Sequence, residues 1–148
     1  MMRLDYQHLA PNGMKAFGGV YMYISGCGLP KPLVDLAYLR ASQINGCAYC
    51  IDSHSHDLLA AGVSAEKLLL VSAWREAGTL FSDRERAALA WTEAVTLVAS
   101  TQISDDLFAT VSAQFSEKEV ADLTLSIGLI NAYNRIAISF RRGPDARP

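Results

Sequence analysis

The hydrophobic residues of this chain recur at the spacing of α-helices along nearly its whole length. Within residues 31–45, Leu33, Leu36 and Ile44 fall on one face at 3.6 residues per turn, and residues 82–100 show the same period. No run of alternating apolar and polar residues between turns indicates the strands of a sheet. The pattern therefore predicts an all-α protein.

Glycine, proline and N-cap residues divide this pattern into separate helices. Ser82 with Glu85, and Ser116 with Glu119, have the spacing of a capping box, and Gly46 is expected to end a helix in the left-handed conformation. The predicted helices cover residues 13–25, 31–45, 47–61, 64–78, 82–100, 104–115 and 116–142.

The last predicted helix is apolar on two sides. One stripe contains Val120, Leu123, Ile127 and Ile130, and the other contains Leu125, Leu129, Ile136 and Phe140. Such a helix lies at the centre of its domain or in a subunit interface. Asn131, Asn134 and Arg135 interrupt it, and we expect them to make inter-helix or inter-subunit hydrogen bonds. The alternative places Arg135 beside a substrate anion.

Length and composition indicate one ordinary globular domain. The 148 residues are enough for one sizeable core, and no repeat or linker divides them, so we treat 1–148 as one domain with a flexible tail at 142–148. The net charge of −2 gives no basis for binding nucleic acid or an anionic membrane. No apolar run reaches the roughly 18 residues that span a bilayer, and the first residues show no uninterrupted apolar stretch of the signal-peptide type. We expect a cytoplasmic protein.

The chain has three cysteines, an odd number that is too small for the disulfide framework of a secreted domain. In a reducing compartment the close pair Cys47 and Cys50 is more typical of redox chemistry or metal binding than of a structural disulfide. Cys27 stands alone in a Gly/Pro-rich break, and we expect it to be a small buried apolar side chain.

Residues 44–57, INGCAYCIDSHSHD, carry the candidate chemistry. Cys47 is expected at the start of the helix after Gly46, with Cys50 on the same face of the first turn. Free N–H groups and the helix dipole favour a thiolate there. His54 follows Cys50 by four residues, so its imidazole lies next to that thiol. A thiol beside an imidazole is an activated nucleophile, and a second thiol can capture the sulfenic acid it forms.

Two other interpretations fit these residues less well. A zinc site needs four ligands in a tetrahedron, but His54 and His56 point about 200° apart on one helix, and His8 lies in an apparently loose segment. We therefore expect no metal, and we expect His56 to face solvent. The other interpretation is a helix start with two buried cysteines that have no chemical role. Such a helix would not need two thiols in its first turn and a histidine one turn further on.

Asp35 is the acid expected beside this histidine. The helices before and after Gly46 should run antiparallel, with Asp35 about 15 Å before that turn and His54 about 10 Å after it. The carboxylate could orient the imidazole or relay a proton to it. Alternatively, Asp35 pairs with Lys31 or stabilises the first turn near Pro32.

An acid, eleven residues, and then C-x-x-C-x-x-x-H form the active-site pattern of the alkylhydroperoxidase D-like group, part of the carboxymuconolactone decarboxylase superfamily, which this chain resembles. The resemblance is most specific in LRASQINGCAYCIDSHSHDLLAAG and continues through SAWREAG, SDRERAALAWTEAVTL and LTLSIGLINAYNRIAISFR. It implies an all-helical domain with its core motif at about 31–78, in a protein that forms trimers or hexamers. The two-sided last helix suits such a homo-oligomer.

The resemblance also implies roles for the residues. Physical arguments leave open which thiol attacks, because the helix terminus favours Cys47 and His54 favours Cys50. By resemblance, Cys50 attacks a peroxide, Cys47 resolves the intermediate, and His54 with Asp35 relays protons without any cofactor. Two departures stand out: aspartate is one methylene shorter than the family's glutamate, and Ala48-Tyr49 stand where the best-known peroxidase of the family has a histidine.

The expected function is that of an antioxidant thiol peroxidase or disulfide reductase. Its partners would be a peroxide or another small electrophile, and an external dithiol or thiol-disulfide reductant. The superfamily name offers a decarboxylase or lactone-processing enzyme as an alternative, although such enzymes do not rely on a cysteine pair. A non-enzymatic oligomer that senses redox state through the same thiols is the third interpretation.

Overall fold

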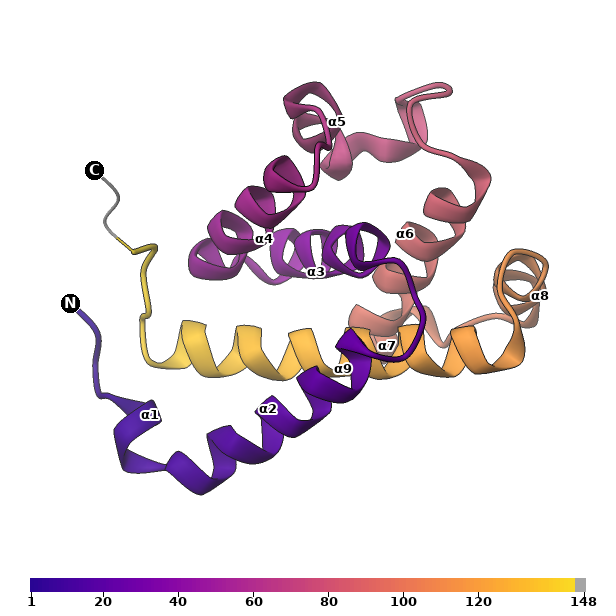
Figure 1. Ribbon diagram of the computed structural model, residues 1–148. Coiled ribbons are helices and arrows are strands. Elements are labelled where there is room, and N and C mark those ends of the chain that lie inside the picture. The colour runs from indigo at the N-terminus through magenta and orange to yellow at the C-terminus, as the bar shows by residue number, and fades with distance from the viewer. Residues whose placement is uncertain (146–148) are drawn as a thin grey trace.

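The computed structural model describes residues 1–145, and over that range its regular elements are all helices. In chain order (Figure 1) they are α1 (Tyr6–Leu9), α2 (Pro11–Ser25), α3 (Lys31–Asn45), α4 (Ala48–Ala60), α5 (Ala65–Leu69), the 3₁₀ helix η1 (Val71–Glu76), α6 (Asp83–Thr96), α7 (Val98–Thr101), α8 (Asp105–Ser112) and α9 (Glu117–Ser139). The all-α prediction is confirmed for these residues. The expected flexible tail, 142–148, falls in part on 146–148, which lie outside the described residues.

Helix α3 is the element around which the others pack. Nine of its 15 residues are buried, and it contacts α4, η1, α6 and α9. The small side chains of Ala37, Ala41 and Ser42 are fully buried, so the neighbouring helices approach its axis closely. Helix α3 contributes to both apolar clusters of the core, one shared with α9 and the other with α4, η1 and α6. Most side chains of α3, including Asp35, are therefore enclosed by other helices.

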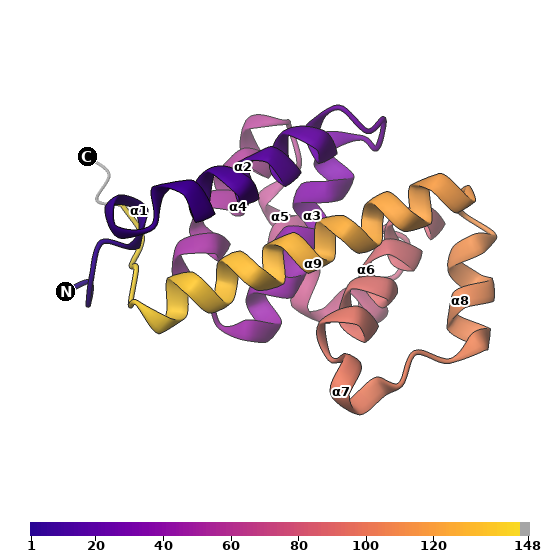
Figure 2. The same ribbon diagram turned by 90° about the horizontal axis from the view of Figure 1, so that it is seen from below.

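Helix α9 runs the length of the molecule, with α2 along one flank and α6 and α8 along the other (Figure 2). The hydroxyl of Tyr23 in α2 donates to the Asp122 carboxylate of α9 at 2.8 Å, and Lys118 pairs with the same carboxylate at 2.5 Å. Asp122 is buried, and these partners offset the free-energy cost of burying its charge. The C-terminal part of α2 is thereby held against α9.

Helix boundaries follow the local sequence signals where those signals are strong. Ser82 and Ser116 form the predicted capping boxes with Glu85 and Glu119. Gly46 ends α3 with φ of 74°, a left-handed conformation that glycine adopts without steric strain. This single residue reverses the chain, so that α4 starts immediately afterwards and packs on α3.

Two predicted helices are interrupted. Residues 64–78 were expected to form one helix but form α5 and η1, with non-helical backbone at Ala73. Arg86 of α6 donates to three carbonyls in and after η1, so a side chain from another helix supplies the bonds that a continuous helix would make itself. The helix predicted over residues 82–100 breaks at Leu97, between α6 and α7. There the Thr101 hydroxyl of α7 donates to the Ala94 carbonyl of α6.

The N-terminal part of the chain contains structure that the pattern did not predict. His8, expected in a loose segment, lies in α1, where the N-cap Asp5 accepts a bond from its backbone N–H and contacts its imidazole at 2.6 Å. Tyr6 stacks on Phe140, with 5.5 Å between ring centroids, which joins α1 to the end of α9. Cys27 was expected to be buried but is only partly so, because the turn after α2 keeps it at the edge of the core.

The surface bears on two of the remaining expectations. Among the described residues no helix is both long and apolar enough to cross a membrane. Between α2 and α9 an open groove is lined mainly by apolar side chains, among them the exposed Val20 and Leu125. Leu125 belongs to the second apolar stripe of the last helix. The homo-oligomer, whether trimer or hexamer, stays a prediction.

Replacing Ser116 with alanine removes the side-chain cap of α9. We expect the free energy of unfolding to fall by about 1 kcal/mol, because the Glu119 backbone N–H loses its acceptor. Urea unfolding followed by circular dichroism measures this change. Ser112→Ala, at an exposed position at the end of α8, is the matched control. Equal losses in the two variants would contradict the prediction.

Candidate active site

The two cysteines lie where α3 turns into α4. Cys47 is the N-cap residue of α4, in extended backbone conformation, and Cys50 is the third residue of the helix. Both side chains belong to the apolar cluster that α3 shares with α9, and they are 1% and 4% exposed. The dithiol therefore sits at the positive end of a helix, within the core of the molecule.

Cys50 nevertheless borders an open pocket of about 270 Å³. Side chains from α1, α2, α4 and α9 form its wall, and His54 is one of them. Cys47 is not among the lining residues, so it lies behind Cys50 as seen from the pocket. Of the two cysteines, Cys50 is therefore the one that a small molecule in this pocket can approach.

The two thiols share one proton near neutral pH. A hydrogen bond from the Cys50 thiol lowers the pKa of Cys47 to about 7; burial opposes this shift, and the Cys50 backbone N–H and the Asn134 amide add to it. The same hydrogen bond between the two thiols raises the pKa of Cys50, and burial and the negative charge on Cys47 act in the same direction. The charge of the pair is therefore centred on Cys47, and access from the pocket is through Cys50.

Asn134 of α9 holds a fixed position beside this pair. Its side chain is fully buried; its Nδ2 donates to Ser42 Oγ at 3.0 Å, and its Oδ1 accepts from Asn45 Nδ2 at 2.9 Å. The inter-helix bonds predicted for Asn134 are thus confirmed. Its amide also lowers the pKa of both thiols, a role that the sequence did not indicate.

One turn further along α4, His54 faces Asp35 of α3. Its Nδ1 lies 3.8 Å from Asp35 Oδ1 and 4.0 Å from Asp57 Oδ2, and it has no hydrogen-bond partner within the described residues. The Lys31 ammonium lies 2.5 Å from Asp35 Oδ2 and 3.8 Å from Asp57 Oδ2. Asp35 is therefore a neighbour of His54, as the helix register predicts, and also the partner of Lys31. Its role toward the imidazole stays a prediction.

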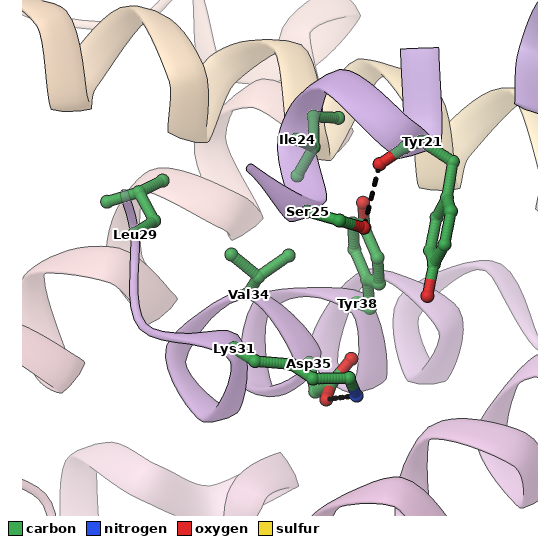
Figure 3. A pocket seen from close by; sticks show the side chains of 8 residues that line it. All are labelled: Tyr21, Ile24, Ser25, Leu29, Lys31, Val34, Asp35 and Tyr38. Atoms are coloured by element: carbon green, nitrogen blue, oxygen red, sulfur yellow. Dashed lines mark hydrogen bonds and ion pairs between the residues drawn. The ribbon is translucent and has the colours of Figure 1, made fainter. Parts of the chain in front are cut away.

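Asp35 is a buried carboxylate that stays ionised. Burial by itself would raise its pKa, but His54 and Lys31 outweigh burial and hold it below its ordinary value. Asp35 also borders a second cavity, of about 140 Å³, between α2 and α3 (Figure 3). The Tyr38 hydroxyl, in a residue that lines this cavity, is buried without a hydrogen-bond partner in residues 1–145. Asp35 lines this cavity and His54 lines the Cys50 pocket, so the contact between the two residues lies between the two cavities.

Asp35, His54 and Asp57 are the residues that could hold a metal ion, since one ligand atom from each lies within 4.8 Å of the others. The Lys31 ammonium already lies against both carboxylates and supplies positive charge there. The set contains neither cysteine. His56, predicted to face solvent, is exposed, so the zinc ligands considered from the sequence do not converge.

One arginine near the site was not assigned from the sequence. Arg135, considered there as a possible partner of a substrate anion, is exposed and bonds Asn131 of its own helix. Arg142 instead lines the Cys50 pocket, with its guanidinium 3.9 Å from the centre of the Tyr49 ring. Burial raises the pKa of Tyr49, so this phenol stays protonated at neutral pH. No sequence signal marks Arg142, because the turn after α9 decides where it points.

Comparisons with known proteins agree with this fold. The model of the carboxymuconolactone decarboxylase family matches residues 10–94, a range that contains Asp35, Cys47, Cys50 and His54. The uncharacterised protein YdfG of Bacillus subtilis is 35% identical over 93% of this chain and 92% of its own length. The fold and the site define a class of all-helical proteins that carry a thiol pair at the start of a helix. The chain belongs to the carboxymuconolactone decarboxylase family.

Two further relatives bear on the alkylhydroperoxidase-like group. The crystal structure of a protein of unknown function from Agrobacterium tumefaciens, described as a candidate antioxidant defence protein AhpD, has a TM-score of 0.95 and 39% identity, covering 99% of this chain and all of that one. The alkyl hydroperoxide reductase AhpD of Rhodopseudomonas palustris is 54% identical over 41 residues, 28% of this chain and 23% of that protein. The chain is therefore AhpD-like in fold.

The shared proton predicts a thiolate that forms near neutral pH. Thiolate absorbance in the ultraviolet should rise with an apparent pKa of about 7, because the Cys50 thiol stabilises the Cys47 anion. Cys50→Ala removes this donor, and the pKa of Cys47 should then move toward the value of about 8.5 of an ordinary cysteine. Cys27→Ala, outside the site, should leave the transition in place. A transition near pH 7 that persists in Cys47→Ala would contradict this assignment.

Proposed function

We propose that this protein is a cofactor-free thiol peroxidase in which Cys50 and Cys47 reduce a peroxide and an external dithiol regenerates them. The observation that carries the proposal is that Cys50 lines an open pocket and has the second thiol, Cys47, within hydrogen-bond reach. The family and the similarity to proteins named AhpD support a peroxidase-type activity. A cytoplasmic location and a homo-oligomer belong to the same proposal.

The chemistry balances in two steps. The Cys50 sulfur attacks the terminal oxygen of ROOH, the O–O bond breaks, and ROH leaves once the alkoxide takes the proton that Cys50 loses. The Cys47 thiolate then attacks the sulfenic sulfur of Cys50, a disulfide forms, and the hydroxide leaves as water. A pKa of about 7 suits Cys47 for this second step, because much of it is ionised at neutral pH. An external dithiol reduces the disulfide by thiol exchange and is itself oxidised.

His54 and Asp35 are assigned to the proton transfers. Cys50 must lose its proton for attack, and the leaving alkoxide must gain one; His54 lines the same pocket and can carry it. Asp35 holds a negative charge 3.8 Å from the imidazole and can orient it. A side-chain adjustment of about 0.8 Å brings the two atoms into hydrogen-bond range.

The two alternatives fit the site less well. A decarboxylase or lactone-processing enzyme makes no use of two thiols at a helix terminus. A non-enzymatic redox sensor needs the thiols but makes no use of an open pocket that His54 shares with Cys50. The peroxidase accounts for the thiol pair, the pocket and the histidine together.

The first test is peroxide consumption with dithiothreitol as the dithiol. Wild-type protein should consume hydrogen peroxide, and one equivalent without reductant should lower its mass by two hydrogen atoms, mapped to a Cys47–Cys50 disulfide. Cys50→Ser should abolish turnover, because its hydroxyl is not oxidised by peroxide. Cys27→Ser is the matched control and should keep turnover and disulfide. Turnover that survives in Cys50→Ser would remove the proposal.

The second test concerns the acid beside His54. Asp35→Asn removes the charge but keeps the size, and we expect kcat to fall roughly 10²-fold, since the negative charge beside the proton-carrying imidazole is lost. Asp35→Glu should restore much of the activity, because it returns the carboxylate with a longer reach. Steady-state rates across a pH series, with far-UV circular dichroism to check folding, measure both effects. Equal rates in Asn and Glu variants that are both folded would exclude a charge-dependent role.

A further inference from the structure

We propose that the preferred substrate of this site is a small hydroperoxide that carries a carboxylate, and that Arg142 binds this carboxylate in the Cys50 pocket. The inference rests on the proposed peroxidase function and adds to it the chemical class of the substrate. It also gives a role to an arginine that the reaction steps described above do not use.

The way in which α9 ends holds Arg142 at the pocket. The backbone N–H of Arg142 donates to the Ala137 carbonyl at 2.9 Å, and that of Arg141 donates to Ile138 at 3.1 Å, which are the two bonds of a Schellman motif. Arg141 has φ of 55°, a left-handed conformation that a residue other than glycine seldom adopts. This reversal brings Arg142 alongside Ala137, and both line the pocket that Cys50 borders.

The guanidinium of Arg142 is positioned but not neutralised. It lies over the ring of Tyr49 and donates a single long hydrogen bond, 3.4 Å, to the Tyr6 hydroxyl. Within residues 1–145 no carboxylate forms an ion pair with it; Asp145 acts on it electrostatically from farther away. Most of its five N–H donors thus remain available, and their planar arrangement matches a carboxylate. The stacked ring keeps the group oriented for such a ligand.

Asp57, the acidic residue that lines the same pocket, is paired with another cation. Its carboxylate lies 3.8 Å from the Lys31 ammonium. The chain as a whole carries a net charge of −2, so its overall field does not attract anions. Attraction of an anionic substrate is therefore local, and it comes from Arg142.

The rest of the pocket sets the size and polarity of the substrate. Met14, Ile130 and Tyr133 contribute apolar and aromatic side chains to its wall. A volume of about 270 Å³ lies just under the roughly 300–1,000 Å³ that is typical of pockets for drug-sized ligands. One ring or a short alkyl chain fits this space, and a long lipid does not. With the carboxylate on Arg142, the hydroperoxide end is directed to Cys50, where it is reduced to the alcohol as above.

The test uses a matched pair of substrates, 4-carboxycumene hydroperoxide and its neutral carboxamide. Wild-type protein with dithiothreitol should show kcat/KM about tenfold or more higher for the acid, the order expected for hydrogen bonds to a charged group. In Arg142→Gln the acid-to-amide ratio should fall close to one. The ratio within each variant cancels any general effect of the substitution on Cys50. Binding of the unreactive 4-isopropylbenzoate, followed by calorimetry, should weaken about tenfold in the same variant.

Arg141→Gln is the matched control, because it removes the same charge from the neighbouring residue. The Arg141 side chain is exposed and does not line the Cys50 pocket. It should keep the wild-type ratio. If folded Arg142→Gln keeps the acid preference, or if wild type has none while both peroxides are consumed through Cys50, the inference is overturned and the proposed function stands. If no peroxide is consumed by any variant, the peroxidase itself fails, and the substrate assignment fails with it.

Discussion

Burial of the α4 N-terminus between α3 and α9 is the constraint on which the chemistry depends. Removing water from a thiolate raises its free energy, and an apolar site without donors would raise the pKa of both cysteines. Here the Cys50 thiol, a backbone N–H and the Asn134 amide replace the lost water around Cys47. Asn134 also joins α9 to Ser42 and Asn45 of α3. The bonds that hold the core together therefore also set the charge of the dithiol.

The two sulfurs divide the properties that a single reactive cysteine would need to combine. Cys47 has the lower pKa but lies behind its partner, whereas Cys50 borders the pocket and holds the proton. A fully desolvated thiolate would be unreachable, and an exposed one would be open to unspecific oxidation. With the negative charge on Cys47 and the pocket at Cys50, the proposed attack and resolution would fall to different atoms.

The charged groups next to His54 also share a partner. Asp35, Asp57 and Lys31 form a compact set in which one ammonium serves two carboxylates, so Asp35 remains ionised although it is buried. The charge next to the imidazole is thereby maintained without a metal ion. Arg142 adds to the Cys50 pocket a positive charge that no described carboxylate pairs with directly.

Local sequence determined the features that depend on residues close together in the chain. The helices, the two capping boxes, the turn at Gly46 and the Cys50–His54 spacing all follow from interactions within about four residues, where propensity and hydrogen-bond geometry leave few alternatives. The approach of Asp35 to His54 was also predictable, because a single glycine joins their helices and antiparallel packing then sets the register. The chain pattern correctly placed the thiols at a helix start for the same reason.

Only the tertiary structure decided the rest. Asn134 meets Ser42 across 92 positions, and Arg142 reaches the pocket because Arg141 adopts a left-handed conformation that no sequence motif indicates. The break between α5 and η1 depends on a side chain from α6, and the proton shared by the thiols depends on the exact burial of both sulfurs. Contacts of this kind leave no periodic trace in a sequence, because they arise from how separate helices happen to pack against one another.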